Sequence, residues 1–164
     1  MIAVLHRISP FTYLIPALAY GLSDSPVGML AWILERWASW SDNMVMSKNV
    51  FSKDDILTHA TIFWVNNVIE TSMRVYANAN RYPWTPSHHR WPVVEASTGI
   101  TFVGYENPPG ITTENRARNF LDSDRAPWYN HVNITAHAEG GHFIPWEISD
   151  KWAQDLRRTF RGRR

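Results

Sequence analysis

Residues 130–147 read NHVNITAHAEGGHFIPWE. Val132, Ile134 and Ala136 alternate with other residues, and this period of two is typical of a β-strand with one buried face. Two adjacent glycines follow, and they let the backbone turn sharply and approach other groups closely. The stretch therefore predicts a strand, a tight loop that carries His142, and then a helix.

A second strand and a second helix precede this stretch. Residues 93–106, VVEASTGITFVGYE, are rich in β-branched and aromatic residues, which favour a strand. Residues 111–121, ITTENRARNFL, predict a helix whose N-cap is Thr112 or Thr113.

Residues 145–160, PWEISDKWAQDLRRTF, predict an amphipathic helix at the end of the chain. Four apolar side chains form its expected inner face: Ile148, Trp152, Leu156 and Phe160. Strand, helix, strand and helix thus alternate in this half of the chain. Such alternation predicts the end of a parallel sheet in a protein of the α/β class.

The first half of the chain is expected to be helical. Residues 23–42, SDSPVGMLAWILERWASWSD, predict a helix with Pro26 at an early position and Asp24 or Ser25 as its N-cap. Four apolar residues recur at helical spacing along it: Leu30, Ile33, Trp37 and Trp40.

A longer helix is expected next. Ser52 and Asp55 resemble a capping box, and the residues that follow, up to about Tyr76, contain no proline or glycine. This pattern predicts one continuous helix. Residues 81–92, with three prolines, predict a linker or an ordered loop.

Two polar side chains occupy comparable places in the predicted sheet. Glu106 follows the first strand, and His142 lies on the loop that follows the second. Reactive groups in parallel sheets sit on loops beyond the carboxyl ends of the strands. We therefore expect this carboxylate and this imidazole to meet.

Composition bounds the class of protein. With 164 residues, 45% apolar and 19% charged, the chain is typical of one globular domain rather than a disordered segment. The formal net charge of +1 gives no reason to expect nucleic acid as a partner. Without cysteine there are no disulfides or thiolate metal sites. His88 and His89 have no second set of ligands, so they predict no metal site. The sequence implies no organic cofactor.

The two ends of the chain suggest no membrane attachment. Charged residues and prolines interrupt residues 1–22, which lack the apolar length of a membrane span and the clean core of a secretory signal. We expect a cytoplasmic protein with no membrane span. The basic residues 157–164 are expected to form a solvated tail.

Three segments carry a family resemblance: AYGLSDSPVGMLAWILERWASWSD (19–42), SKDDILTHATIFWVNNVIETSMRVY (52–76) and EGGHFIPWEISDKWAQDL (139–156). Together they resemble the C-terminal part of epoxide hydrolases with the α/β-hydrolase fold, in the branch that includes the microsomal and juvenile-hormone enzymes. The resemblance implies a helical lid portion at residues 18–85 and the last strands and helices of the core at residues 86–164.

The resemblance also implies a two-step reaction. An aspartate attacks an epoxide carbon to form an ester, lid tyrosines donate to the epoxide oxygen, and a histidine oriented by a carboxylate activates the water that releases a diol. His142 matches the general base, Glu106 the orienting acid and Tyr76 a lid tyrosine. Glu95 and Glu139 are alternatives to Glu106. The implied substrates are water and an apolar epoxide that is a small molecule. The aromatic content suggests that the epoxide carries a bulky group.

The nucleophilic aspartate of the family lies on a GGDWG-like turn that this sequence does not contain, and residues 1–17 do not match the family. We therefore expect the downstream portion of a longer gene, inactive and poorly stable alone. A separately encoded N-terminal half or self-association would cover the apolar surfaces left exposed. The alternatives are related ester or haloalkane hydrolysis, and a non-catalytic small-molecule or protein binding module.

Overall fold

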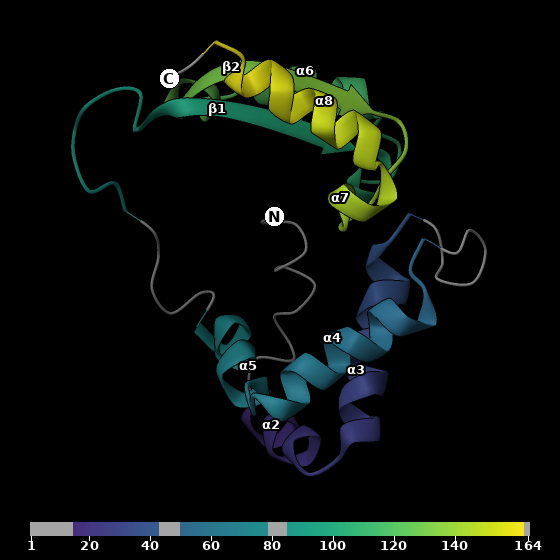
Figure 1. The fold of residues 1–164 in the computed structure, drawn as a ribbon. Helices are drawn as coiled ribbons and strands as arrows, with labels where there is room; N and C mark the ends of the chain where they lie inside the picture. Colours follow the sequence, from purple (N-terminus) through teal and green to yellow (C-terminus); the bar gives the residue numbers. More distant parts are fainter. Residues whose placement is uncertain (1–14, 43–49, 79–84, 163–164) are drawn as a thin grey trace. The chain divides into compact units, whose positions relative to one another are not determined.

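A computed structural model describes residues 15–42, 50–78 and 85–162 (Figure 1). The predicted N-terminal segment 1–17 therefore lies, apart from its last three residues, outside the described residues. The predicted proline-rich loop is described only from residue 85 onward.

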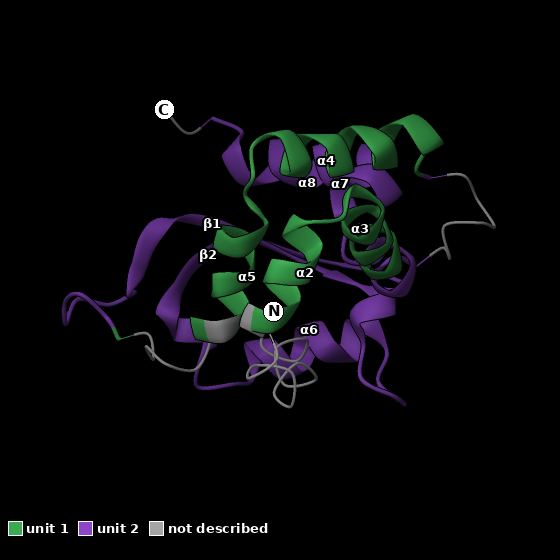
Figure 2. Ribbon diagram, turned by 90° about the horizontal axis from the view of Figure 1, so that it is seen from below, with its two compact units in different colours: residues 1–36, 51–85 green, residues 37–50, 86–164 purple. Residues whose placement is uncertain are grey.

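The chain divides into two compact units, coloured separately in Figure 2. The first comprises residues 1–36 and 51–85, and the second comprises residues 37–50 and 86–164. In their described parts, the first unit contains helices and the second contains a sheet with helices. No helix among the described residues is both long and apolar enough to cross a membrane.

The described part of the first unit contains α2 (Ile15–Ser23), most of α3 (Pro26–Trp40), α4 (Lys53–Val65) and α5 (Ile69–Asn78). Helix α2 packs against α5. The buried side chains are almost all apolar, and they include Leu22, Met29, Ile56, Ile69 and Met73. Burial of such side chains, at about 1.5–3 kcal/mol each, is the main force that holds the helices of this unit together.

Hydrogen bonds at the caps explain where two of these helices begin. The backbone N–H of Gly28 donates to Ser25 Oγ at 2.9 Å, so Ser25 rather than Asp24 caps α3. At the start of α4, Asp55 N–H donates to Ser52 Oγ at 3.0 Å, and Ser52 N–H donates to Asp55 Oδ2 at 2.9 Å. The predicted capping box is thus confirmed.

The buried face of α3 differs in part from the prediction. Ile33 and Trp37 are buried as expected, but Leu30 and Trp40 are only half-buried, and Met29 is 1% exposed. The buried line follows steps of four residues from Met29, whereas the predicted line mixed steps of three and four. Both lines agree with the helical period, so periodicity alone does not choose between them.

The prediction of one continuous helix up to Tyr76 was wrong, because the chain breaks between α4 and α5. Helix α4 ends at Val65, and Asn66 caps it, with its side-chain amide donating to Ile62 O at 2.8 Å. Asn67 then adopts a left-handed conformation with φ of 48°. Asparagine tolerates that region better than other non-glycine residues, so an Asn–Asn pair can end a helix without proline or glycine.

Two parallel strands, β1 (Val94–Val103) and β2 (Tyr129–His137), form the sheet of the second unit. Helix α6 (Thr113–Leu121) connects them and is capped by Thr112, whose Oγ1 accepts from Asn115 N–H at 3.2 Å. The predicted strands and this predicted helix are confirmed. The remaining elements are η2 (Gly104–Glu106), η3 (Ala126–Trp128), α7 (Ile144–Glu147) and α8 (Ser149–Phe160).

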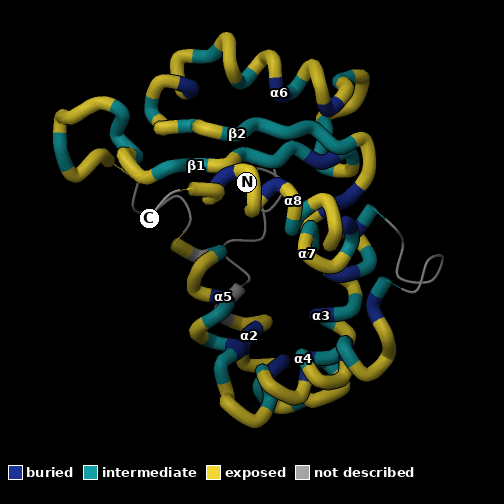
Figure 3. The backbone as a smooth tube through the Cα atoms, turned by 45° about the horizontal axis from the view of Figure 1, so that its top comes forward, coloured by how far each residue is buried: buried dark blue, intermediate teal, exposed yellow. Residues whose placement is uncertain are grey.

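Helices cover both faces of this sheet, α6 on one side and α8 on the other (Figure 3). On the α6 side, Phe120 packs against Phe102 of β1 with ring centroids 5.9 Å apart. The mixture of helices with a parallel pair of strands is consistent with a partial α/β fold, as the sequence predicted.

The last predicted helix differs in two respects from the observed one. It is interrupted at Ile148, which separates α7 from α8. Its inner face is also partly polar, since Asp155 and Thr159 are 2% and 3% exposed, whereas Leu156 and Phe160 are 39% and 55% exposed. The predicted inner face is thus confirmed for Ile148, which is 8% exposed, and in part for the half-buried Trp152, and it was wrong for Leu156 and Phe160.

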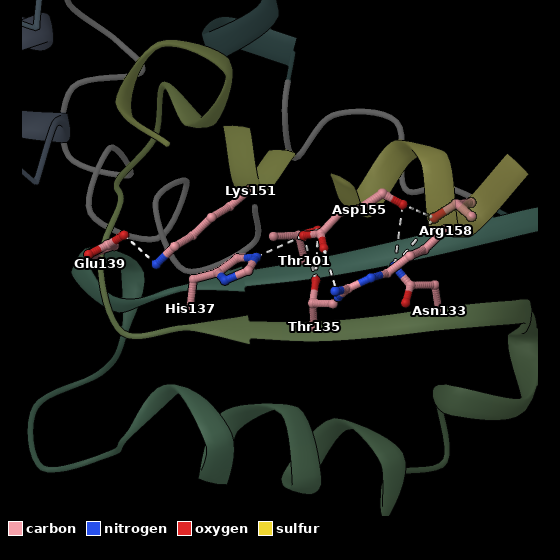
Figure 4. A network of polar contacts seen from close by, with 9 residues as sticks. Thr101, Asn133, Thr135, His137, Glu139, Lys151, Asp155 and Arg158 are labelled. Atoms are coloured by element: carbon pink, nitrogen blue, oxygen red, sulfur yellow. Dashed lines mark hydrogen bonds and ion pairs between the residues drawn. The ribbon is translucent and has the colours of Figure 1, made fainter. Parts of the chain in front are cut away.

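Polar groups on the strands explain this orientation of α8. Asp155 Oδ2 accepts hydrogen bonds from Thr101 Oγ1 at 3.0 Å and Thr135 Oγ1 at 2.7 Å, and it lies 2.8 Å from His137 Nε2 (Figure 4). Burial alone raises the pKa of Asp155, but the hydrogen bonds from His137, Thr135 and Thr101 together hold that pKa below its ordinary value. Thr159 packs against Gly99 of β1 so closely that a Cβ atom added at Gly99 would lie 2.2 Å from Thr159 Oγ1.

Replacing Asp155 by alanine removes the acceptor shared by three partly buried groups. We expect the free energy of unfolding to fall by about 3 kcal/mol, because buried polar groups are left without a partner. Urea denaturation at neutral pH measures the loss. Asp150→Ala is the matched control, since Asp150 is exposed in the first turn of the same helix, and it should change stability by no more than about 0.5 kcal/mol.

The same comparison has a predicted pH dependence. A carboxyl whose pKa is lowered by folding stabilises the native state fully above its unfolded pKa, and the contribution is lost as pH falls through its folded pKa. The stability difference between wild type and Asp155→Ala should therefore shrink in acid. A difference that stays constant down to the acid transition would contradict the role of the charged carboxylate.

Candidate functional site

The parallel pairing of the strands brings two loops to one edge of the sheet. Val103, the last residue of β1, lies opposite His137, the last residue of β2. Glu106 closes η2, which follows β1 at once, and His142 lies in the loop between β2 and α7. Both side chains therefore lie beyond the carboxyl ends of adjacent strands.

His142 and Glu106 contact each other there. His142 Nδ1 lies 3.2 Å from Glu106 Oε1, and the two side chains are 38% and 19% exposed. When Nδ1 carries the proton and donates to the carboxylate, Nε2 keeps its lone pair. Within the described part of the chain, Nε2 has no hydrogen-bond partner. The arrangement can therefore accept a proton at Nε2 and stabilise the resulting imidazolium through Glu106.

Neighbouring groups set the charge and the orientation of the pair. The hydrogen bond from His142, aided by the charges of His142 and Arg116, holds the pKa of Glu106 below its ordinary value against the opposing effect of burial. Arg116 also donates to the backbone oxygen of Glu106 at 3.0 Å. The Trp40 ring packs against the imidazole with centroids 5.0 Å apart, and the Phe143 ring meets it edge-on at 5.4 Å.

The two glycines before His142 have distinct structural roles. Gly140 has φ of +90°, in the left-handed region that favours glycine. Gly141 lies so close to the end of α3 that a Cβ atom would be 2.5 Å from Asp42 N and 2.7 Å from Trp40 O. His142 N–H donates to the same Trp40 oxygen at 2.9 Å. The glycines therefore let the loop turn and dock on the segment that follows α3.

The two alternative carboxylates have other partners. Glu95 pairs with Arg90 at 2.8 Å, and Glu139 pairs with Lys151. Of the three carboxylates considered from the sequence, Glu106 is the one that lies against His142.

Tyr76 lies in α5 of the first unit, where its phenol is beside the guanidinium of Arg36. The structure thus brings two of the three predicted site residues together within one unit, and the role of Tyr76 stays a prediction. No cluster of three or more histidine, cysteine or acidic side chains that could hold a metal ion is present among the described residues.

Sequence reasoning missed a second histidine–carboxylate pair, His137 with Asp155, in the interface between the sheet and α8. His137 differs from His142 in having neither a glycine turn before it nor an exposed ring nitrogen in a loop. The alternation of β2 does place His137 on the same face as Thr135, and this was the one signal available.

Comparison with known proteins gives several similar sequences. Juvenile hormone epoxide hydrolase of Bombyx mori is 27% identical over 149 residues, which cover 83% of this chain and 29% of that protein. Epoxide hydrolase 1 of Sus scrofa is 27% identical over 143 residues, 84% of this chain and 30% of that protein. Juvenile hormone epoxide hydrolase 1 of Ctenocephalides felis is 33% identical over 150 residues, 82% of this chain and 28% of that protein.

These similarities support a distant relationship to the epoxide hydrolases. The chain spans less than a third of the length of these relatives. No protein-family model matches it.

Replacing Gly141 by alanine tests the docking of the loop that carries His142. The new Cβ would overlap backbone atoms, which cannot rotate away, so we expect a loss of about 1–3 kcal/mol in the free energy of unfolding. Gly21→Ala is the control, because nothing lies within 4 Å of its added Cβ in helix α2. Thermal denaturation of both variants decides the point, and equal stability of the two would show that the loop is not docked.

The hydrogen bond between His142 and Glu106 can be tested by titration. Because His142 lowers the pKa of Glu106, His142→Ala should move that pKa upward, toward the ordinary value of a glutamate. Carboxyl ¹³C NMR of the 164-residue chain measures it. His89→Ala, at an exposed loop position, should leave the titration unchanged. An unchanged Glu106 titration in His142→Ala would mean that the pair does not form in solution.

Proposed function

We propose that this chain carries the hydrolytic part of an epoxide hydrolase active site, with His142 as general base and Glu106 as the acid that orients it. Similarity to proteins named epoxide hydrolase supports a general role in epoxide hydrolysis. The observation that carries the finer assignment is the 3.2 Å contact between His142 Nδ1 and Glu106 Oε1, on loops that follow two adjacent parallel strands.

The proposed chemistry follows from the two ring nitrogens of His142. With the Nδ1 proton donated to Glu106, Nε2 takes a proton from water, and the hydroxide oxygen attacks the carbonyl carbon of an aspartyl ester. The bond between that carbon and the substrate oxygen breaks, and the imidazolium returns the proton to the departing alkoxide. A diol and a free aspartate result. The Glu106 carboxylate stabilises the imidazolium while it exists.

Tyr76 has a separate proposed role, in the step that forms the ester. A phenol O–H is a hydrogen-bond donor, and it can stabilise the alkoxide that develops when the epoxide ring opens. The support is the match of Tyr76, at the end of the RVY sequence in α5, to a lid tyrosine of the family. Substitution of Tyr76 by phenylalanine should slow ester formation and leave ester hydrolysis unchanged.

The mechanism also needs an aspartate nucleophile. The family's GGDWG-like turn does not occur in these 164 residues, and the matched relatives are more than three times as long as the region they share with this chain. We propose that a segment outside these residues supplies the aspartate, within a longer polypeptide or on a partner chain. The substrate is then an apolar epoxide, with aromatic side chains such as Trp40 and Phe143 beside the base.

A fusion enzyme tests this proposal. The part of Bombyx mori juvenile hormone epoxide hydrolase that precedes the matched region is joined to this chain, and diol formation from an aromatic epoxide is measured. We expect activity that falls about 10²- to 10⁴-fold in His142→Gln, since a positioned general base contributes that much. Glu106→Gln should lower kcat by a smaller factor.

Matched controls keep the result specific. His89→Gln and Glu95→Gln change the same residue types at exposed positions away from the pair, and both should retain full activity. A folded fusion that binds the epoxide but forms no diol, with or without His142, would favour a non-catalytic binding module. Activity that survives His142→Gln would exclude His142 as the base.

A further inference from the structure

Two carboxylates that do not touch the imidazole hold the backbone on both sides of His142. Glu147, the last residue of α7, accepts a hydrogen bond from Phe143 N–H at 2.8 Å through Oε1 and from Asp42 N–H at 2.7 Å through Oε2. Asp42, just after α3, accepts from Gly140 N–H at 2.8 Å through Oδ2.

These contacts join two segments that are far apart in sequence. Asp42 and Glu147 are separated by 105 positions. The bond from His142 N–H to Trp40 O, at 2.9 Å, lies between the carboxylate contacts, so the N–H groups of Gly140, His142 and Phe143 are all paired. We call this set of bonds, made by Trp40, Asp42 and Glu147, the backbone clasp.

The clasp restricts where the imidazole can go. A bond between a carboxylate and a backbone N–H is charge-assisted, hence shorter and stronger than a neutral one. With the peptide groups before and after His142 fixed, the Cα–Cβ bond of His142 has one direction. The side chain then keeps Nδ1 toward Glu106 and its ring against Trp40.

We propose that Glu147 and Asp42 are positioning residues for His142, acting through the backbone clasp rather than through contact with the substrate. As far as catalysis is concerned, this inference rests on the proposed function. Its geometric content does not, since it predicts that loss of either carboxylate lets the loop shift and separates His142 from Glu106. A misplacement of about 1 Å at a catalytic group is enough to lower a rate about 100-fold.

The first arm of the test needs no activity. In the 164-residue chain, the Glu106 carboxyl is titrated by ¹³C NMR in wild type, Glu147→Ala and Asp42→Ala. The midpoint should rise in both variants toward the value found in His142→Ala, because the bond from His142 is made less often. Asp42→Asn keeps the acceptor oxygen that Gly140 N–H needs and should restore much of the wild-type midpoint. Glu147→Gln keeps one of two acceptor oxygens and should give a midpoint between those of wild type and Glu147→Ala.

A variant that matches the loss of stability separates positioning from general unfolding. Asp155→Ala weakens the packing of α8 and leaves the clasp and the backbone pairing of β1 with β2 in place. It should therefore lower the melting temperature and leave the Glu106 midpoint unchanged. A wild-type midpoint in folded Glu147→Ala and Asp42→Ala would overturn the proposal. If Glu147→Ala does not fold, Glu147→Gln decides, because it loses one of the two acceptor oxygens: a midpoint above the wild-type value supports positioning, and a midpoint equal to the wild-type value overturns it.

The second arm uses the fusion enzyme. Glu147→Ala should lower kcat about 10- to 100-fold with little change in KM, because the base is displaced while substrate contacts remain. A shifted Glu106 midpoint with unchanged activity, in a fusion whose activity also survives His142→Gln, would refute the proposed function and leave the clasp intact. Unchanged kcat in Glu147→Ala, with activity still dependent on His142, would refute the positioning role.

Discussion

The parallel pairing of β1 with β2 is the interaction on which the candidate site depends. Its register places Val103 opposite His137, so the two strands end together and their following loops meet. Side chains alternate between the faces of a strand, so a slip of one residue would turn every side chain of one strand to the opposite face. It would also displace Glu106 from His142 along the strand direction by about 3.3 Å.

The interface with α8 favours this register over its neighbours. Asp155 finds Thr101, Thr135 and His137 within hydrogen-bond distance because all three side chains face the same helix. Purely apolar side chains would tolerate a shift more readily, since dispersion contacts have little directionality. A buried carboxylate with directional partners does not tolerate such a shift, because each lost hydrogen bond leaves a polar group unsatisfied. This polar interface lies toward the carboxyl ends of the strands, the same ends beyond which the candidate site is found.

The sequence predicted the elements better than their orientations. Alternation in residues 130–137 and the β-branched and aromatic residues of 93–106 predicted the two strands, and the capping residues predicted the starts of α3, α4 and α6, because these signals are local. The break at Asn67 was missed because asparagine also occurs inside helices. The polar part of the buried face of α8 was missed because the sequence suggests an exposed position for Asp155 until its partners on two strands are known. The contact of His142 with Glu106 was expected from strand-end positions, but the bond between Asp42 and Glu147 joins residues 105 positions apart and has no local signal.

The mass of the fusion enzyme during a single turnover tests the central claim most directly. Because the base acts on the ester and not on the epoxide, His142→Gln should gain the mass of one epoxide and keep it, while the unsubstituted enzyme returns to its original mass as diol appears. Rapid quenching followed by intact-protein mass spectrometry distinguishes the two. An ester that disappears equally fast in both proteins, or one that never forms in His142→Gln although it forms in the unsubstituted enzyme, would contradict the assignment of His142 as the base of the hydrolytic step.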